Sequence, residues 1–399
     1  KSCDIYLKGY SLSSFYAIWH LLESSMIIFL LIFIVLYGGL NFYAFSRTRN
    51  VLHLSGKVQI MVIVLLVLMV LAPVIIRLAE SCHLETLARS IAYVGYLWMA
   101  FVFLFFFLDI AFNLLRYICK FFFKSAGSAP VRNIVFGLSI FVSFIFVVYG
   151  FFDAQRVRVN KMEIQTEQSL LNNGKIRIVQ ISDVHIGLIV RDKRLQKIID
   201  CVKSANPDIL VSTGDLLDGE LDNVMPQARQ LAQIRTRYGK YAVAGNHEYY
   251  AGIEHSLEFT KNAGFEILRD ETRQVAGINI IGMDDVTGRK LGIIRDNPRL
   301  AHLSPAIQSN GFILLLKHQP FVNNNENFNL QLSGHTHCGQ IFPFTLITRL
   351  YFSKNCGYYQ LGKNKSLYVT RGAGTWGPPV RILAQPEITI IDLIGKKID

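Results

Sequence analysis

Four long apolar stretches in the first 153 residues constrain the fold of this chain more than any other feature of its sequence. They cover residues 25–45, 58–78, 91–112 and 134–152. Each approaches the roughly 20 residues that a helix needs to cross the hydrocarbon core of a bilayer. A segment such as FVFLFFFLDIAF would be hard to keep in solution. We therefore expect a multi-pass integral membrane protein in which residues 1–153 form an all-α bundle of four transmembrane helices.

The composition agrees with a membrane portion. Hydrophobic residues make up 51% of the 399 residues, and the formal net charge is +12. Many of the early Lys and Arg residues lie between the apolar stretches, where they act as topology signals or meet anionic headgroups. No basic module with interleaved aromatic residues is visible, so we expect the lipid bilayer, and no nucleic acid, as a partner. The sequence carries no signal for an oligomeric state.

The basic residues between the stretches predict an orientation. Seven of them lie in or beside the loops near residues 47–57 and 116–132, and four lie on the opposite side (Lys1, Lys8, Arg77 and Arg89). The positive-inside rule then places the C-terminal half outside the cytoplasm, across an inner or plasma membrane. Arg156, Arg158 and Lys161 follow the last stretch and would even the count if they were included.

Two carboxylates lie within or beside the apolar stretches, at Glu23 and Asp109. Intramembrane carboxylates can form an ion relay, as in a transporter. With only two of them and no basic partner inside the stretches, we instead expect each to lie near an interface or against a neighbouring helix.

The cysteines give no structural framework. All six are scattered and none forms a CxxC pair, so we expect neither a zinc knuckle nor a disulfide framework. We expect Cys338 to be a packed side chain.

The pattern changes after about residue 160. KIRIVQISDVH, PDILVSTGD and KYAVAGNHE are typical of buried strands, and RDKRLQKIIDCVKSAN between the first two is typical of a helix. Alternating strands and helices predict an α/β layered domain. We expect a linker at 154–171 and this domain at 172–399.

Polar residues follow the ends of the predicted strands. They are Asp183, His185, Asp215, Asp218, Asn246, His247, His318, His335 and His337. Strand ends of open α/β sheets converge on one crevice, and Asp, Asn and His are ligands of Mn, Fe or Zn. Taken singly, His318 would be an ordinary strand-end histidine and Asp215 a turn residue. In the order DxH, GDxxDG, GNHE, H and GHTH, they predict a metal site.

These motifs, with SDVHIG, GNHEYYAG, GHTHCGQIFP and RGAGTWGPPVR, resemble the calcineurin-like metallophosphoesterase superfamily over residues 172–393. They are most similar to its members with transmembrane helices before the catalytic domain. The resemblance implies a transmembrane bundle followed by an α/β metallophosphoesterase domain of two mixed β-sheets sandwiched by helices. A lipid A branch carries Arg where GNHE has His247, a departure that weakens an assignment as UDP-diacylglucosamine pyrophosphatase.

The resemblance also implies two divalent metal ions (Mn, Fe or Zn) and a role for each residue. Asp183, His185 and His337 would hold the first ion, and Asn246, His318 and His335 the second. Asp215 would bridge both. His247 would face the scissile phosphate as a general acid or as a charge clamp, because two-metal hydrolysis leaves an oxygen to be protonated.

Four further residues are candidates around this site. Asp218 and Glu248 are expected to orient ligand imidazoles. Arg371 and Arg381 either reach substrate phosphate or are surface charges on a glycine-rich loop.

The segment IFPFTLITRLYF (341–352) follows the last histidine pair directly. It is either a core element under the site or an apolar rim that dips into the membrane surface, and we favour the rim. Phe342 and Phe344 would then contact the acyl chains of an amphipathic substrate.

The predicted function is a membrane-anchored, dinuclear-metal phosphoesterase. It would hydrolyse a phosphodiester or pyrophosphate bond of a lipid-linked or cell-envelope substrate. The alternatives are a UDP-diacylglucosamine pyrophosphatase, which needs a cytoplasmic site, and a non-catalytic membrane sensor or scaffold, which the intact ligand set disfavours.

Overall fold

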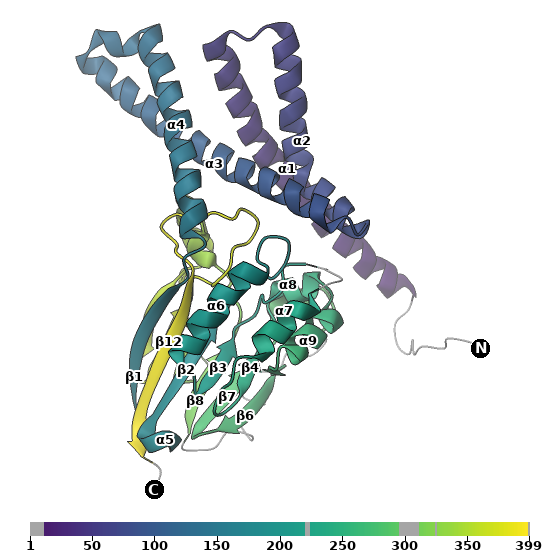
Figure 1. Ribbon diagram of the computed structural model, residues 1–399, viewed down its shortest axis with the longest axis vertical. Coiled ribbons are helices and arrows are strands. Elements are labelled where there is room, and N and C mark those ends of the chain that lie inside the picture. Colours follow the sequence, from purple (N-terminus) through teal and green to yellow (C-terminus); the bar gives the residue numbers. More distant parts are fainter. Residues whose placement is uncertain (1–11, 220–223, 295–310, 324, 398–399) are drawn as a thin grey trace.

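The computed structural model describes residues 12–219, 224–294, 311–323 and 325–397. Four helices come first (Figure 1): α1 (Leu12–Leu52), α2 (Gly56–Ser81), α3 (Glu85–Phe122) and α4 (Ala129–Asp153). Among the described residues, four segments of these helices are long and apolar enough to cross a membrane: Leu31–Leu52, Gly56–Ser81, Glu85–Phe122 and Ala129–Asp153. The predicted N-terminal helices are therefore confirmed.

Apolar side chains cover the outside of these helices, and small residues allow close contact between them. Val35, Phe42 and Phe121 are all exposed, as expected for side chains that face lipid. Between α2 and α3, a Cβ added to Gly95 would lie 2.7 Å from the Cβ of Ala72. Small residues at such crossings let transmembrane helices pack closely.

Asp109 is paired, and the expectation that it has no basic partner was wrong. Its buried carboxylate on α3 accepts hydrogen bonds from Arg47 (Nε, 2.7 Å; Nη2, 3.1 Å) and from Tyr43 (2.5 Å), both on α1. Ser139 on α4 donates a further hydrogen bond of 3.1 Å. Helix α1 continues to Leu52, so Arg47 lies in the helix and not in a loop. Asp109 thus lies against neighbouring helices, whereas the side chain of Glu23 is outside the described part.

The C-terminal half contains two six-stranded mixed sheets. The first has the strand order β1-β12-β2-β3-β4-β5, and the second has the order β10-β11-β9-β8-β7-β6. The strands of the first sheet are β1 (Arg158–Leu170), β2 (Lys175–Ile181), β3 (Ile209–Ser212), β4 (Lys240–Ala242), β5 (Glu266–Ile267) and β12 (Glu387–Lys397). Those of the second are β6 (Glu271–Val275), β7 (Ile278–Gly282), β8 (Phe312–Leu316), β9 (Leu330–Ser333), β10 (Gly357–Gly362) and β11 (Lys365–Val369).

The two sheets face each other, and helices cover the first sheet from outside. Ile178 and Val211 of the first sheet share a buried apolar cluster with Ile280 and Leu314 of the second. Helices α6 (Asp192–Ala205), α7 (Met225–Ala232) and α9 (Ile253–Asn262) pack on the opposite face of the first sheet (Figure 1). The shorter helices are α5 (Leu171–Gly174), α8 (Asn246–Tyr250), α10 (Val286–Lys290), α12 (Phe344–Tyr351) and the 3₁₀ turns η1 (Lys124–Gly127) and η3 (His337–Gly339). This arrangement confirms the predicted fold class.

The segment expected as a linker (154–171) is instead mostly an edge strand. Within it, β1 pairs in parallel with β12, with Arg158 opposite Glu387. Its side chains alternate between exposed and half-buried, so its sequence is polar enough to resemble a spacer. The strand is held chiefly by backbone hydrogen bonds to β12, whose sequence lies at the other end of the chain.

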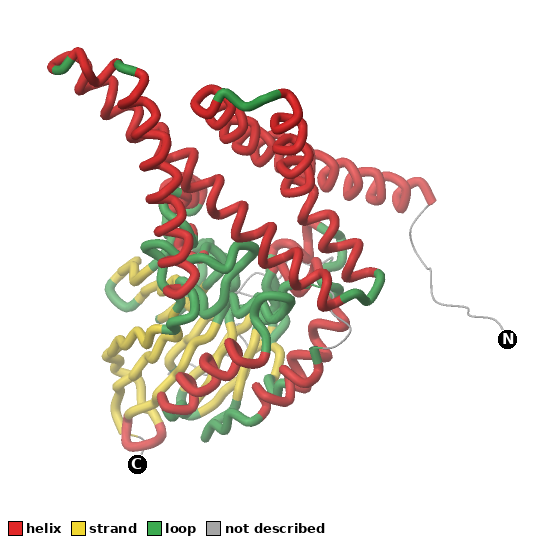
Figure 2. The backbone as a smooth tube through the Cα atoms, turned by 45° about the horizontal axis from the view of Figure 1, so that its top comes forward, coloured by secondary structure: helices red, strands yellow, loops and turns green. Residues whose placement is uncertain are grey.

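The N-terminal helices are packed onto the C-terminal half and are not merely tethered to it. Ile76 of α2 and Ala92 of α3 belong to the same buried cluster as Val184 and Leu217. On α4, the carbonyl of Gly150 accepts a hydrogen bond from the Arg381 N–H (3.0 Å). The α1–α2 and α3–α4 connections lie at the end of the bundle far from the sheets (Figures 1 and 2).

Candidate metal centre

The predicted ligands come together at one edge of the two sheets. Parallel strands β2, β3 and β4 deliver the residues that follow them, and parallel strands β8 and β9 do the same from the second sheet. Because the carboxyl ends of parallel strands meet at one edge, loops from both sheets converge there.

Asp183, His185 and His337 form the first group. One potential ligand atom from each lies within 4.8 Å of the others, and all three residues are buried. The Nε2 atoms of His185 and His337 are 3.0 Å apart. Asp183 Oδ1 lies 3.6 Å from His337 Nε2. Two imidazole nitrogens and a carboxylate that converge away from water are a donor set that fits a divalent cation.

Asp215, His318 and His335 form the second group, also within 4.8 Å. Asn246 Oδ1 joins it, at 2.8 Å from His335 Nδ1 and 3.0 Å from His318 Nε2. Asp215 Oδ2 lies 3.2 Å from His318 Nε2 and 3.7 Å from His185 Nε2. Asp215 therefore reaches both groups, which is the position expected of a bridging carboxylate.

Two glycines allow these carboxylates to approach the neighbouring backbone. A Cβ at Gly245 would clash with Asp215 Oδ1, and a Cβ at Gly334 would clash with Asp183 Oδ2. Any larger residue at either position would displace a predicted ligand.

Neighbouring polar groups orient the histidine rings. The Asp218 carboxylate lies 3.2 Å from His185 Nδ1, where its charge can orient the ring. His318 Nδ1 is 2.8 Å from the carbonyl of Thr213 and donates to it. His247 Nδ1 likewise donates to the carbonyl of Asp218 (2.9 Å). With Nδ1 engaged in these contacts, Nε2 of His185, His318 and His247 is left to face the centre of the site.

Glu248 has a different task from the one expected. Its buried carboxylate accepts the backbone N–H groups of Gly245 (2.7 Å), Asp215 (2.9 Å) and Leu216 (2.7 Å). It therefore fixes the loops that carry Asp215 and Asn246, and it does not orient an imidazole.

Arg381 is not available to a substrate. It is fully buried, and its guanidinium donates to the carbonyls of Gly374 (2.7 Å), Arg371 (2.8 Å) and His337 (3.1 Å). Its Nη2 also lies 2.9 Å from His337 Nδ1. Burial lowers the pKa of Arg381 to about 9. The side chain supports the loop of a predicted ligand, and neither sequence-based alternative for it was right.

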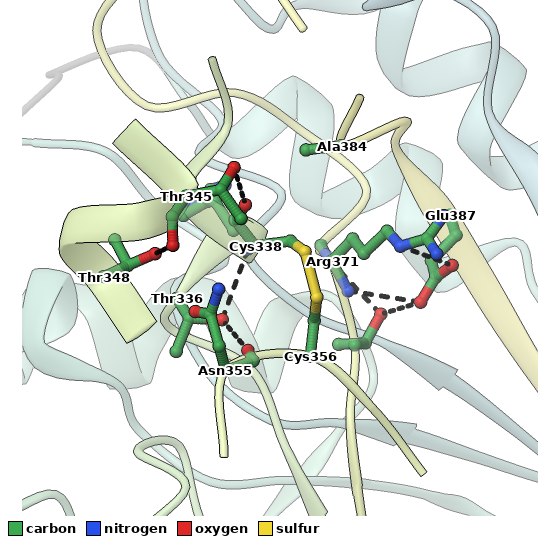
Figure 3. Close-up of a disulfide and its surroundings, with 12 residues drawn as sticks. Thr336, Cys338, Thr345, Thr348, Asn355, Cys356, Arg371, Ala384 and Glu387 are labelled. Carbon is green, nitrogen blue, oxygen red and sulfur yellow. Dashed lines mark hydrogen bonds and ion pairs between the residues drawn. A yellow bond between two sulfur atoms is a disulfide. The ribbon is translucent and has the colours of Figure 1, made fainter. Parts of the chain in front are cut away.

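Arg371 remains partly open. Its side chain is 39% exposed, and its Nε lies 3.9 Å from Glu387 Oε2 (Figure 3). It retains the freedom that a contact with substrate phosphate would need.

Electrostatics favour the metal-binding protonation state at some of the predicted ligands and oppose it at others. Against the effect of burial, neighbouring carboxylates raise the pKa of His185 and His318, and burial raises the pKa of Asp183. Burial alone would raise the pKa of Asp215, but His318 and His247 hold it well below its ordinary value. Burial lowers the pKa of His335 to about 3. Burial, helped by the charge of Arg381, also holds the pKa of His337 well below its usual range. An ionised carboxylate and neutral imidazoles are the forms in which these groups coordinate metals.

Cys338 is buried, as expected of a packed side chain, but it is disulfide-bonded to Cys356, a pairing that was not predicted. The two Cα atoms are 5.3 Å apart, within the usual range for a disulfide. Helix α12 lies between the two cysteines in sequence, and the bond closes the segment that follows His337 (Figure 3). A single pair separated by 18 residues has no recognisable spacing in the sequence.

Within the segment 341–352, Ile341 is buried in a cluster with Ala100 and Val380, and Phe344–Tyr351 form helix α12, in which no residue is buried. Phe342 and Phe344 are each 41% exposed. The Phe344 ring lies 6.3 Å from that of Phe103 on α3, and the Phe352 ring lies 5.3 Å from His335. Apart from Ile341 the segment is thus not a core element, and it lies between the N-terminal helices and the candidate metal centre.

Two aromatic residues beside His247 were not predicted. Tyr250 and Trp376 both have rings close to its imidazole. Both lie within motifs visible in the sequence, GNHEYYAG and RGAGTWGPPVR, but neither motif indicates that their rings lie beside His247.

Comparison with known proteins agrees with this geometry. Residues 176–339 match the family model described as calcineurin-like phosphoesterase. An uncharacterized metallophosphoesterase of Aquifex aeolicus is 36% identical over 262 residues, which cover 64% of this chain and 99% of the relative. An uncharacterized metallophosphoesterase of Campylobacter jejuni is 33% identical, over 67% of this chain and 72% of the relative. A Danio rerio protein described as a transmembrane protein with metallophosphoesterase domain is 33% identical, over 68% and 64% respectively.

Proposed function

Because the chain belongs to the calcineurin-like metallophosphoesterases, we propose that it is a membrane-anchored phosphoesterase with two metal ions. It would hydrolyse a phosphodiester or pyrophosphate bond. The observation that carries the proposal is the pair of ligand groups that meet at Asp215. The same complete set disfavours a non-catalytic sensor or scaffold.

The side chains divide the chemistry between them. Two bound divalent ions (Mn, Fe or Zn) would supply an activated water and neutralise phosphoryl oxygens. His247 would donate a proton to the leaving oxygen from Nε2, since its Nδ1 is engaged by the Asp218 carbonyl. The Asp215 carboxylate accepts a hydrogen bond from the backbone N–H of His247 (2.9 Å). This bond fixes the position of His247 relative to both ligand groups.

A substrate with apolar chains fits the surroundings of the site. No residue of α12 is buried, and the ring of Phe344 lies beside that of Phe103 on α3. An acyl chain that left the bilayer there would stay in apolar surroundings up to Phe352, next to His335. We therefore propose an amphipathic, lipid-linked or envelope phosphate ester.

Turnover by the purified full-length protein tests the function. With Mn²⁺ we expect hydrolysis of bis(4-nitrophenyl) phosphate, and release of phosphate or headgroup from a total lipid extract. Asp215→Asn, prepared in the same way, excludes a contaminant. If the wild type turned over neither the model ester nor any lipid, the sensor or scaffold would become the better assignment.

We further propose that the catalytic half lies outside the cytoplasm. Of the seven basic residues counted above, Arg47 pairs with Asp109 inside the bundle, and the other six lie in or near the helix ends at the α1–α2 and α3–α4 connections, far from the sheets (Figure 1). The Cys338–Cys356 disulfide is a feature of oxidising compartments. Both arguments oppose a UDP-diacylglucosamine pyrophosphatase, whose nucleotide-linked substrate is cytoplasmic.

Two free cysteines allow the orientation to be tested. Cys82, between α2 and α3, is exposed on the catalytic side, whereas Cys119 lies near the far end of α3. In intact cells, with Cys3 and Cys201 replaced by Ser, a membrane-impermeant maleimide should label Cys82 and leave Cys119 unmodified until the cells are opened. The reverse pattern would place the site in the cytoplasm.

A further inference from the structure

Two exposed aromatic rings stand beside His247. Tyr250, on α8, is 53% exposed, and its ring centroid lies 5.7 Å from that of His247. Trp376 is 51% exposed, and its ring centroid lies 6.1 Å from the same imidazole. Large aromatic side chains normally bury most of their surface, so two half-exposed rings at one histidine call for a partner.

The loop that carries Trp376 is firmly held. Gln340 exchanges two hydrogen bonds with the Trp376 backbone, from Nε2 to the carbonyl (2.9 Å) and from the Trp376 N–H to Oε1 (3.0 Å). Arg194 donates to Thr375 Oγ1 (3.0 Å). The Gly374 N–H donates to the carbonyl of Asp183 (2.8 Å). The indole is therefore presented at a fixed place relative to a predicted metal ligand, although its ring is not anchored in a core.

We infer that Tyr250 and Trp376 form an aromatic subsite for a ring-shaped leaving group of the substrate. The inference rests on the proposed function, because it takes His247 as the proton donor. In that reaction the water oxygen bonds to phosphorus and the bond from phosphorus to the leaving oxygen breaks. The leaving oxygen keeps the electron pair and takes the His247 proton.

The position of the leaving group follows from this proton transfer. Its oxygen must lie within hydrogen-bond reach of His247 Nε2, so the group attached to that oxygen lies next to the two rings. A nucleobase, an aryl group or the apolar face of a sugar can stack on Tyr or Trp, whereas a short alkyl group gains little there. The acyl chains of an amphipathic substrate would lie on the other side, along α12.

Paired diesters test the subsite. Bis(4-nitrophenyl) phosphate presents a ring on the leaving side, and bis(2,2,2-trifluoroethyl) phosphate, followed by ¹⁹F NMR, presents none. Trp376→Ala should raise KM for the aryl diester about tenfold, the size of one lost stacking contact, and should change KM for the ring-free diester much less. Trp376→Phe should restore most of the loss. Equal changes for both diesters would mean that Trp376 only supports His247, and no change for either would mean that no ring binds there.

A binding measurement keeps the subsite separate from the proposed activity. Diphenyl phosphate is a poor substrate, and its titration into the metal-loaded wild type should shift tryptophan emission to shorter wavelength as Trp376 is covered. The shift should be absent in Trp376→Phe. A wild type that hydrolyses both diesters without this shift would overturn the subsite and leave the phosphoesterase standing. A protein that showed the emission shift but hydrolysed neither diester would support the aromatic subsite and contradict the phosphoesterase activity. If vesicles without any ester produced the same shift, Trp376 would be a membrane anchor.

Discussion

Left-handed backbone conformations are concentrated at the candidate metal ligands. Asp183, His185, Asp215, His335 and His337 have φ between 47° and 72°, where a non-glycine residue costs on the order of 1–3 kcal/mol. Hydrogen bonds hold the strained segments in place, such as those from the Asp183 N–H to Gly214 (3.0 Å) and from the His185 N–H to Asp215 (3.1 Å). Strain at so many neighbouring positions indicates that these residues were selected for a functional site and not for stability.

At this scale, Asp215 is the residue on which both ligand groups depend. Asp215→Asn keeps the size of the side chain and removes the charge that would face two cations. We expect a loss of at least about 100-fold in turnover, on the order of 3 kcal/mol, and fewer than two metal equivalents per chain. Metal analysis of the purified variant checks this. Sedimentation of the variant with membranes is the control that it is still inserted. Two retained equivalents with normal turnover would contradict the bridging role.

His247 should separate metal binding from proton transfer. His247→Ala should keep both metal equivalents, because the two ligand groups do not require its ring. Turnover of esters with poor leaving groups should fall about 100-fold or more, whereas a nitrophenyl ester, whose leaving oxygen needs little protonation, should lose less. Equal losses for the two kinds of ester would make His247 a charge clamp.

At the scale of elements, periodicity was sufficient for the four helices and for β2, β3 and β4. Apolar length and strand-end motifs are local properties, so the sequence displays them directly. It was not sufficient for β1, whose polar alternation looks like a linker until β12 is beside it. The pairing of Cys338 was hidden for the same reason, since it depends on how α12 turns the chain back.

Among the site residues, the structure brings together those in the motifs, whereas the tasks of some supporting residues differ from the expected ones. The order of Asp, Asn and His motifs predicted which side chains would meet, and their role as metal ligands stays a prediction. The tasks of Glu248 and Arg381 depend on which backbone groups lie around them. A buried Arg bonded to carbonyls and an Arg that binds phosphate have the same appearance in a sequence.

The ion pair between α1 and α3 permits a test within the bundle. Arg47→Met would leave the Asp109 carboxylate buried without its cation, and breaking a buried pair in this way costs about 3–5 kcal/mol. We expect a lower melting temperature in detergent, partly recovered in Arg47→Met with Asp109→Leu. Arg49→Met, at an exposed position of the same helix, is the matched control. An unchanged melting temperature for Arg47→Met would show that the pair does not stabilise the bundle.

At the scale of the whole molecule, the bundle and the catalytic half share one apolar core. Ile76 and Ala88, from the transmembrane helices, lie in the same cluster as Ile186, next to a predicted ligand. If the bundle spans a bilayer, the candidate metal centre would be held at a fixed height relative to it, unlike a domain on a flexible tether. In that position, α12 lies beside the lipid-exposed faces of the bundle, and its own exposed side chains include Leu346, Ile347 and Leu350.

If α12 admits lipid, replacing its first aromatic residues should affect only substrates with acyl chains. Phe342 and Phe344 are each 41% exposed, so about 1 kcal/mol of burial is available per ring from the roughly 1.5–3 kcal/mol of a whole side chain. Phe342→Ser with Phe344→Ser should raise the apparent KM for a long-chain ester in vesicles about ten- to thirtyfold. Hydrolysis of bis(4-nitrophenyl) phosphate should change little, because the metal ligands are untouched.

The control for this variant is Leu171→Ser, which removes an exposed apolar side chain from α5, at the end of the molecule away from the bundle (Figure 1). It should affect neither substrate. A parallel loss on both substrates in the Phe variant would show that α12 supports the site by packing, since Phe352 continues from it to His335. An unchanged KM for both substrates would mean that lipid enters elsewhere. If the two rings did contact acyl chains, replacing them by polar side chains would weaken the binding of the lipid substrate.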